Sequence, residues 1–280
     1  MIYIGAHINK EGGSLIKTIK KIKQNNGNAL QLFLSNPRST HLPNVLNYYG
    51  ISEEIKEYCD THDIKLVAHA SYTINLASPP LNGKKICELQ DCYWIALLIH
   101  QLISANLIGC MGIVVHVGRN TNKEEGILNQ YNAIKYILNE IRDLELNTKL
   151  LLETPAGVGN ELITNVGEFI DFYDKFDDID KEYLKICIDT AHIWSAGYDI
   201  NNYYDIISKN HAKDILLIHL NNSKKNKGSF VDRHEIITDG LIPINDIKIF
   251  LKKLKHNPMI ILEKPSDNFQ NDIKFVQDSL

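Results

Sequence analysis

Eight short hydrophobic runs alternate along this chain with eight longer amphipathic runs, and this order restricts the fold more than any other feature. The short runs are rich in β-branched residues and predict strands. The predicted strands span residues 2–6, 29–34, 65–69, 112–117, 149–153, 185–189, 214–219 and 258–263. The amphipathic runs predict helices at about residues 11–24, 52–62, 83–106, 124–145, 164–174, 200–209, 243–254 and 268–278.

The run at 124–145 shows why the longer segments are predicted to be helical. Its apolar residues recur at steps of three and four, which places them on one face of a helix. These residues are Ile127, Tyr131, Ile134, Leu138, Ile141 and Leu144. The predicted strands are instead continuous apolar runs, as expected for parallel strands that are covered on both faces.

This order of elements fits the α/β class and, within it, a (β/α)8 TIM barrel. The chain has 280 residues, of which 44% are hydrophobic, and we expect residues 1–280 to form a single barrel domain. An open, doubly wound sheet is the alternative. It is less well supported, because no GxGxxG follows the first strand and no phosphate-loop GKS/T motif is present.

Composition limits the location and the partners of the chain. No apolar run reaches the roughly 18 residues of a membrane span, and the start MIYIGAHINK lacks the layout of a signal peptide. We therefore expect an intracellular protein that makes no membrane contact. The five cysteines form no CxxC pair, and we expect small buried side chains and no disulfide framework.

The formal net charge of −4 does not indicate a nucleic-acid-binding protein. A DNA partner would have to be bound by local basic residues together with bound metal. The candidate basic residues are Arg38, Arg119, Lys224, Lys225, Lys227 and Arg233.

Histidines and acidic residues lie at the predicted ends of the strands, where a TIM barrel carries its functional groups. They are His7, His69, His116, Glu153, Asp189, His192, His219 and Glu263, with Asp232 and His234 in the loop after the seventh strand. A single histidine at a strand end is usually structural. Five histidines and four carboxylates in one pocket need cations, because desolvating each charge costs several kcal/mol. Imidazole and carboxylate ligands together suit zinc, and less specifically manganese or iron. The remaining rim histidine, His7, is expected to support a ligand.

Nine short motifs occur in order along nearly the whole chain. They are GAHINKEGG at 5–13, NPR at 36–38, HASYTINLAS at 69–78, VVHVGR at 114–119, LLETPAGVG at 151–159, CIDTAHIWSAGYD at 187–199, HLNNSK at 219–224, VDRHE at 231–235 and ILEK at 261–264. In these motifs the chain resembles the endonuclease IV family of apurinic/apyrimidinic (AP) endonucleases, also called AP endonuclease family 2. The resemblance implies a xylose-isomerase-like (β/α)8 barrel with a cluster of three zinc ions.

The resemblance also implies a role for each residue of the site. The ligands of the first zinc would be His69, His116 and Glu153. Glu153 would bridge to a second zinc, whose further ligands would be Asp189, His219 and Glu263. The third zinc would be held by His192, Asp232 and His234. Hydroxide on the bridged pair would be the nucleophile, and Mn2+ is an alternative ion at one site.

The implied partner is double-stranded DNA that contains an abasic site. Arg38 and Tyr72 match family positions that enter the DNA at the lesion. Cleavage 5′ of the lesion would leave a 3′-hydroxyl and a 5′-deoxyribose phosphate. We expect a monomer, which suits an enzyme that grips a duplex with one face. Some viral members of the family diverge in a similar way, so we expect the protein in the cytoplasm or nucleus of a host, or in a virion if the source is viral.

The chain departs from the family pattern at four places, namely Ala70, Asn222, Thr238-Asp239-Gly240 and Lys264. Two other functions stay open. A metal-dependent sugar isomerase or epimerase would share the barrel, but the third ligand set and the NPR loop argue against it. A non-catalytic DNA-binding protein would have little reason to keep nine costly buried groups.

Overall fold

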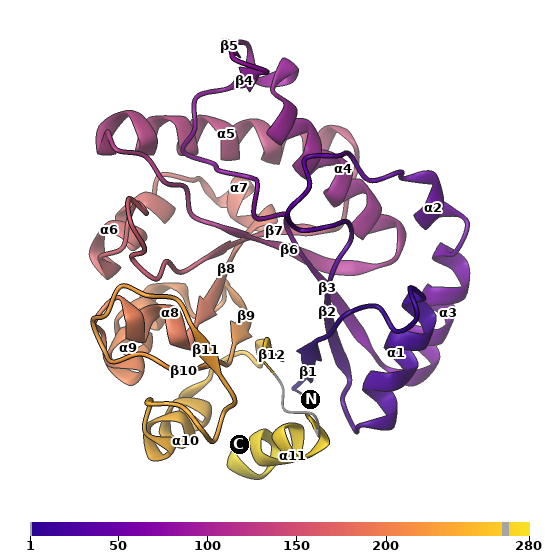
Figure 1. The fold of residues 1–280 in the computed structure, drawn as a ribbon, viewed down its shortest axis with the longest axis vertical. Helices are drawn as coiled ribbons and strands as arrows, with labels where there is room; N and C mark the ends of the chain where they lie inside the picture. Colours follow the sequence, from indigo (N-terminus) through magenta and orange to yellow (C-terminus); the bar gives the residue numbers. More distant parts are fainter. Residues whose placement is uncertain (1, 265–268) are drawn as a thin grey trace.

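Continuous apolar runs form the eight parallel strands of a closed barrel, whose order is β1-β12-β9-β8-β7-β6-β3-β2 (Figure 1). This computed structural model describes residues 2–264 and 269–280. The barrel strands are β1 (Ile4–His7), β2 (Ala29–Phe33), β3 (Lys65–His69), β6 (Cys110–His116), β7 (Lys149–Glu153), β8 (Leu184–Asp189), β9 (Ile215–His219) and β12 (Met259–Leu262). The predicted (β/α)8 barrel is confirmed, and every predicted strand overlaps one of these eight.

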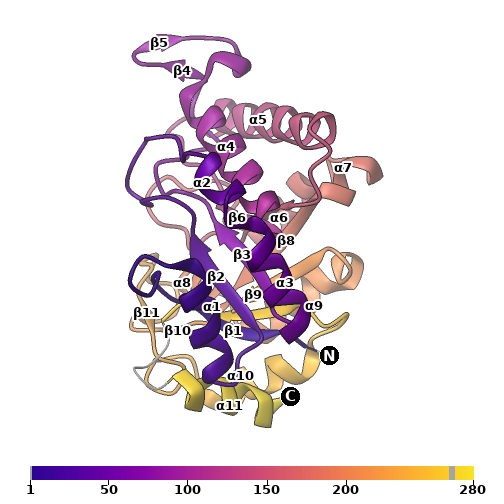
Figure 2. The same cartoon turned by 90° about the vertical axis from the view of Figure 1, so that its right-hand side faces the viewer.

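Helices surround the barrel (Figures 1 and 2). They are α1 (Leu15–Gln24), α2 (Leu46–Tyr49), α3 (Ser52–His62), α4 (Tyr93–Leu107), α5 (Lys123–Asp143), α6 (Val166–Tyr173), α7 (Asp178–Tyr183), α8 (Thr190–Ser195), α9 (Ile200–His211), α10 (Ile244–Lys253) and α11 (Phe269–Ser279). The predicted helix at 268–278 corresponds to α11, although residue 268 lies outside the described residues. None of the described helices combines the length and the hydropathy that a bilayer crossing needs.

The predicted helix at 83–106 is wrong over its first ten residues. The helix α4 begins only at Tyr93, and the segment before it contains a hairpin of β4 (Leu81–Asn82) and β5 (Lys85–Ile86). Gly83 has a φ of 63°, which a residue without a Cβ adopts at little cost. Asn82 pairs with Lys85, so Gly83 and Lys84 form the two-residue loop, in which a glycine at the first position favours a tight hairpin. The hairpin projects beyond the helices (Figures 1 and 2).

Two hydrophobic layers hold the barrel together. The larger layer lies between the strands and the helices. The smaller layer is formed mainly by strand residues, and its buried members are Ala29, Val67, Val114, Leu151, Cys187, Leu217, Met259 and Ile261. All five cysteines are free thiols, as predicted, and all except the partly exposed Cys87 are buried. The carboxyl ends of the strands, where the polar residues gather, meet at one end of this core.

Candidate metal centre

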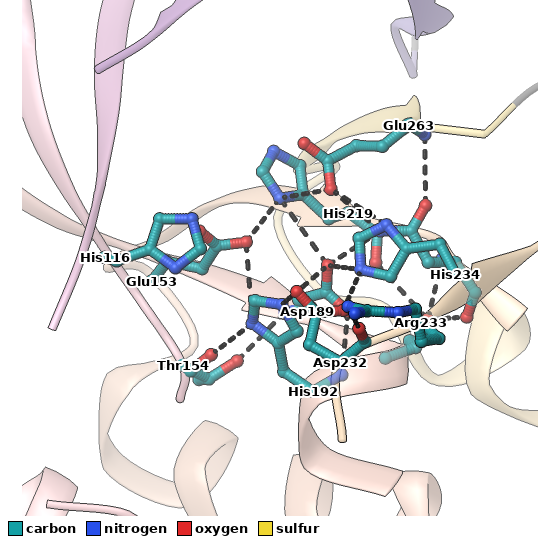
Figure 3. Close-up of polar contacts among 12 residues, drawn as sticks. His116, Glu153, Thr154, Asp189, His192, His219, Asp232, Arg233, His234 and Glu263 are labelled. Atoms are coloured by element: carbon teal, nitrogen blue, oxygen red, sulfur yellow. Dashed lines mark hydrogen bonds and ion pairs between the residues drawn. The ribbon is translucent and has the colours of Figure 1, made fainter. Parts of the chain in front are cut away.

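The nine side chains that the sequence predicted as metal ligands lie together at one end of the barrel, and all but His69 are labelled in Figure 3. Seven of them line one cavity. The other two, Asp189 and His219, are fully buried and contact these seven. Six come from the carboxyl ends of the barrel strands: His69, His116, Glu153, Asp189 and His219 end their strands, and Glu263 directly follows β12. His192 comes from α8. Asp232 and His234 come from a loop that is folded back by a hairpin of β10 (Asn222–Ser223) and β11 (His234–Glu235).

The junction of β8 and α8 explains how Asp189 and His192 reach the same cavity. Asp189 ends the strand and caps the helix, since its Oδ1 accepts a hydrogen bond of 2.9 Å from the backbone N–H of His192. Such a cap satisfies one of the free N–H groups of the first helical turn. His192 is thereby fixed in that turn, and its Nδ1 donates to the carbonyl of Thr154 at 2.9 Å.

The first donor group consists of His69, His116 and Glu153. Oε2 of Glu153 lies 3.7 Å from Nε2 of His69 and 3.4 Å from Nε2 of His116. Nδ1 of His69 donates to the carbonyl of Ala70 at 2.8 Å, which leaves Nε2 as the free lone pair of that ring. The backbone of residue 70 orients the ring, so an alanine side chain at this position does not disturb it.

The second donor group places three carboxylates, those of Glu153, Asp189 and Glu263, around His219. Nδ1 of His219 lies 2.6 Å from Glu153 Oε1, 3.3 Å from Glu263 Oε2 and 3.8 Å from Asp189 Oδ2. Glu153 thus belongs to two groups, and a shared carboxylate of this kind can bridge two cations.

The third donor group contains Asp189, His192 and His234, with Asp232 beside both rings. Nε2 of His234 lies 3.0 Å from Asp232 Oδ1 and 3.6 Å from Asp189 Oδ2. Nε2 of His192 lies 3.4 Å from Asp232 Oδ2. The two imidazoles and two carboxylates therefore surround one point at the edge of the cavity.

Three buried polar atoms in these groups make no well-oriented hydrogen bond with a described residue, although oppositely charged atoms lie 3.0–3.4 Å from them. They are Oε2 of Glu153 and Nε2 of both His192 and His234. A buried polar atom whose hydrogen bond is missing costs about 1–3 kcal/mol, so such atoms call for an explanation. Divalent cations coordinated by these atoms would satisfy all three, and the donor set fits them.

The pKa values report the same concentration of negative charge. Burial alone would lower the pKa of His234, but the nearby carboxylates of Asp189, Asp232 and Glu263 raise it to about 9. Burial would raise the pKa of Glu153, but His116, His219 and His192 hold it well below its ordinary value. His116, for which burial dominates, has its pKa lowered to about 4. The pKa values of Glu263 and Asp232 are lowered as well, mainly by neighbouring histidines, whereas burial raises the pKa of Asp189. The three carboxylates with lowered pKa values therefore favour positive charge beside them.

Three polar residues that orient these side chains escaped the sequence analysis. Gln31 donates to Glu263 Oε1 at 2.7 Å and to Nδ1 of His7 at 3.0 Å, and its Oε1 lies 2.7 Å from His219 Nε2. Asn221 donates to Asp189 and Glu263 at 2.7 and 2.9 Å, and Oγ1 of Thr154 accepts from the backbone of Asp189 at 3.0 Å. The glutamine inside the apolar strand ALQLF could have indicated a buried polar role for Gln31. His7 is linked to Glu263 by Gln31 and lies outside the donor groups.

A cavity of about 300 Å³ opens above the three groups, and its rim includes Tyr72, Arg119, Phe230 and Arg233. The Tyr72 ring lies 5.5 Å from the His69 ring and 5.8 Å from the His116 ring, and 51% of the residue is exposed. Its backbone N–H donates to the carbonyl of Pro37 at 2.9 Å, which joins it to the NPR loop with the exposed Arg38. Phe230, which the sequence analysis missed, is 52% exposed at a φ of 55°.

Asn222, one of the positions where the chain departs from the family pattern, is fully buried and makes four hydrogen bonds. Its amide nitrogen donates to the carbonyls of Ile237 and Ile242, and its oxygen accepts from the backbone of Ser223 and Ile242. An added Cβ on Gly240 would lie 2.3 Å from this amide, so the Thr238-Asp239-Gly240 turn packs directly on it.

Asn222→Ala should lower the free energy of unfolding by about 2–4 kcal/mol, because buried backbone groups lose their partners. Chemical denaturation measures this loss. Asn226→Ala, in the exposed loop that follows, is the control and should change stability by less than about 0.5 kcal/mol. Equal stability of the two variants would show that the four bonds do not hold the loop.

Comparison with known proteins agrees with this geometry. The family model described as a xylose isomerase-like TIM barrel matches residues 19–279. A protein named as an endonuclease 4 of Acanthamoeba polyphaga mimivirus is 32% identical, over 94% of this chain and 86% of its own length. An endonuclease 4 of Thermosipho melanesiensis is 34% identical, over 99% of this chain and 97% of its own.

Among solved structures, endonuclease IV from Thermus thermophilus superposes with a TM-score of 0.76 at 23% identity, covering 99% of this chain and all of that one. This likeness supports the fold alone, whereas the two relatives above 30% identity establish the family. The chain belongs to the endonuclease IV family, within the xylose isomerase-like TIM barrels.

Proposed function

We propose that this protein is a zinc-dependent AP endonuclease that hydrolyses the phosphodiester 5′ of an abasic site in double-stranded DNA. The proposal is supported by relatives named endonuclease 4. The observation that carries it is the presence of three adjoining donor groups that share Glu153 and Asp189. A single metal would need only one of these groups.

The proposed ligands follow the three donor groups. His69, His116 and Glu153 would hold the first ion. Glu153 would also hold the second, with Asp189, His219 and Glu263. His192, Asp232 and His234 would hold the third. Zinc suits this mixture of imidazole and carboxylate, with Mn2+ as an alternative at one site. When bound, the ions supply Lewis acidity that activates water and neutralises charge on the phosphoryl and leaving oxygens.

The chain's own residues would fix the geometry of this reaction. Gln31 and Asn221 hold Glu263 from two sides, and the carbonyls of Ala70 and Thr154 hold the rings of His69 and His192. Partners of this kind set the tautomer and the orientation of a ligand. Water would supply the oxygen that attacks phosphorus, so no Ser or Cys nucleophile is required. Cleavage of the P–O3′ bond on the 5′ side of the lesion would leave a 3′-hydroxyl and a 5′-deoxyribose phosphate.

Lesion recognition would depend on the exposed side chains of Arg38 and Tyr72. An abasic nucleotide has no base to unstack, so turning it out of the duplex avoids much of the few kcal/mol that an intact base requires. An exposed arginine and an exposed tyrosine on joined loops can fill the gap that is left. All nine proposed ligands come from one chain, which supports a monomer as the active unit.

The test of this proposal compares two substrates. Zinc-loaded protein is incubated with a duplex that carries one abasic site and, separately, with a panel of ketoses. We expect incision 5′ of the lesion and no ketose turnover. Ketose turnover without incision would favour the isomerase or epimerase alternative, which uses the same barrel class. Binding of the duplex without incision in the presence of zinc would favour a non-catalytic DNA-binding protein.

Arg38→Ala should weaken binding to an abasic duplex by about tenfold, or about 1.4 kcal/mol, without changing metal content. The arginine is exposed on the loop whose Pro37 hydrogen-bonds to Tyr72, and it lies outside all three donor groups. Fluorescence anisotropy measures the affinity, and elemental analysis measures the metal. Lys252→Ala, on the outer helix α10, is the control for loss of one exposed cation. Unchanged affinity for Arg38→Ala would show that this loop does not contact the lesion.

A further inference from the structure

A partly buried lysine lies at the same end of the barrel as the candidate metal centre but outside the donor groups. Lys10 belongs to the loop that follows β1, within the GAHINKEGG motif, none of whose residues is a proposed metal ligand. The lysine lines two cavities, of about 360 and 420 Å³. The first is formed by the loops after the paired strands β1 and β2, next to Asn36 and Pro37 of the NPR motif.

The ammonium group of Lys10 is held by neutral partners. Nζ donates to the hydroxyl of Tyr48 at 3.1 Å and lies 3.5 Å from the carbonyl of Leu34. The hydroxyl of Tyr48 in turn donates to the same carbonyl. Burial raises the pKa of Tyr48 to about 12, so the phenol stays uncharged at neutral pH. This arrangement fixes the position of the cation without neutralising it.

No carboxylate in the described part of the chain forms an ion pair with Lys10. Its neighbour Glu11 pairs instead with Lys21, at 2.8 Å. Burial lowers the pKa of Lys10, and no nearby acid raises it. Withdrawing a cation from water without a counter-charge is unfavourable, so an anion bound here would recover part of that cost.

The described linings of both cavities contain no acidic residue, although the chain carries more acids than bases. Beside Lys10 they offer hydroxyl and amide side chains that can donate hydrogen bonds. These are Asn9, Ser35 and Asn36 in the first cavity, and Ser35, Asn44 and Asn47 in the second. A fixed cation among neutral donors is the chemistry of a site for a phosphate group.

We propose that Lys10 and the cavity between the loops after β1 and β2 bind one phosphate group of the DNA backbone beside the lesion. The inference rests on the proposed function, because that function brings a duplex to this end of the barrel. The site would position the strand next to the NPR loop and would not take part in the chemical step. Lys10 is therefore a binding residue that acts in substrate association.

The main test measures kcat/KM for incision of an abasic duplex over a range of salt concentrations. Neutralising one phosphate contact changes the slope of log affinity against log salt by about 0.9. For Lys10→Met, we expect the slope of log kcat/KM against log salt concentration to become less steep by about this amount. We also expect KM to rise about tenfold and kcat to stay within about twofold of the parent value. Lys17→Met removes an exposed charge from α1 and should keep the parent slope.

Tyr48→Phe separates this role from a structural one. The variant removes the hydroxyl that holds Lys10 but keeps the cation, so its salt slope should stay that of the parent. If Lys10 only connects its loop to α2 and binds no phosphate, we expect a different result. Lys10→Met and Tyr48→Phe would then lose thermal stability alike, and neither would change the slope. That result would overturn the proposal.

Two further arms distinguish the source of the phosphate. In the first, each backbone phosphate near the lesion is replaced in turn by a neutral methylphosphonate. Replacement of one particular phosphate should weaken binding by the parent protein about tenfold. The same replacement should not weaken binding by Lys10→Met any further. In the second, the phosphorus NMR line of inorganic phosphate is measured with protein alone. The NMR line could broaden with the parent and not with Lys10→Met, while no methylphosphonate position distinguishes the two proteins. That pair of results would assign the site to free phosphate and overturn the assignment to the DNA backbone.

Failure of the inference and failure of the proposed function give different results. A parent protein that incises abasic DNA, with Lys10→Met showing an unchanged slope and no coupled phosphate, would overturn the inference alone. A parent protein that incises no abasic duplex would overturn the proposed function, and the backbone assignment of Lys10 would fall with it.

Discussion

Glu153→Gln should reduce kcat/KM for abasic-site incision by more than about a thousandfold, which corresponds to more than about 4 kcal/mol of transition-state stabilisation. Glu153 is the carboxylate shared by the first two donor groups, with one oxygen facing His69 and His116 and the other facing His219. The amide has nearly the same shape but no charge, so it cannot bridge two cations. Single-turnover incision measures the rate, and elemental analysis should show a loss of bound metal.

Glu161→Gln is the matched control. Glu161 lines the same cavity but lies outside the donor groups, and its Oε2 accepts a hydrogen bond of 3.0 Å from the backbone of Val158. A glutamine can accept the same bond, so this variant should incise within about threefold of the parent rate. Thermal denaturation checks that both variants are folded. Parent-like incision by Glu153→Gln would refute the assignment of this residue as the bridging ligand.

Removal of metal by a chelator should abolish incision completely and lower the melting temperature. The nine clustered groups include four carboxylates, three of which surround His219. Once the cations leave, only the neighbouring histidines oppose the mutual repulsion of these carboxylates. Ligands that bind only the folded state stabilise it by mass action, so the stability should return with added metal. Incision and melting temperature are followed together as zinc is titrated into the metal-free protein.

Incision and melting temperature should both recover completely when about three equivalents of zinc have been added to the metal-free protein. Mg2+ at the same concentration should restore little, because it prefers oxygen ligands and binds imidazole poorly. Full activity in the presence of excess chelator, or full recovery with Mg2+ alone, would contradict a zinc centre built from these histidines.

The strands and the convergence of the polar residues could be predicted because they depend on regular patterns. A parallel strand that is buried on both faces needs a continuous apolar run, and 149–153 is an example that the structure reproduces as β7. Barrel closure then brings every strand end to one rim. For this reason His69, Glu153 and His219, which are distant along the chain, could be expected to meet without any knowledge of side-chain contacts.

The features that were missed depend on one short turn or on contacts between distant segments. The hairpin of β4 and β5 replaced the start of a predicted helix, since the Gly83-Lys84 turn interrupted the helical periodicity. Asn221 and Thr154 are ordinary polar residues in the sequence, and only the folded barrel shows that they hold Asp189. The exposed ring of Phe230 gave no signal either, because exposure is a property of the finished surface.

The barrel alone does not separate a nuclease from a sugar isomerase, because the family model itself carries the xylose isomerase name. Function follows from the site. In this chain the discriminating feature is the third group, in which His192 from α8 meets Asp232 and His234 from the hairpin loop. That loop follows β9 in the sequence and is folded back toward the site where β10 pairs with β11.

An anomalous-difference map of the crystallised protein, recorded on both sides of the zinc absorption edge, tests the central claim most directly. We expect three peaks that vanish below the edge: one among His69, His116 and Glu153, one beside His219, and one between His192 and His234. A single peak, or peaks away from these side chains, would contradict the trinuclear zinc centre on which the proposed nuclease depends.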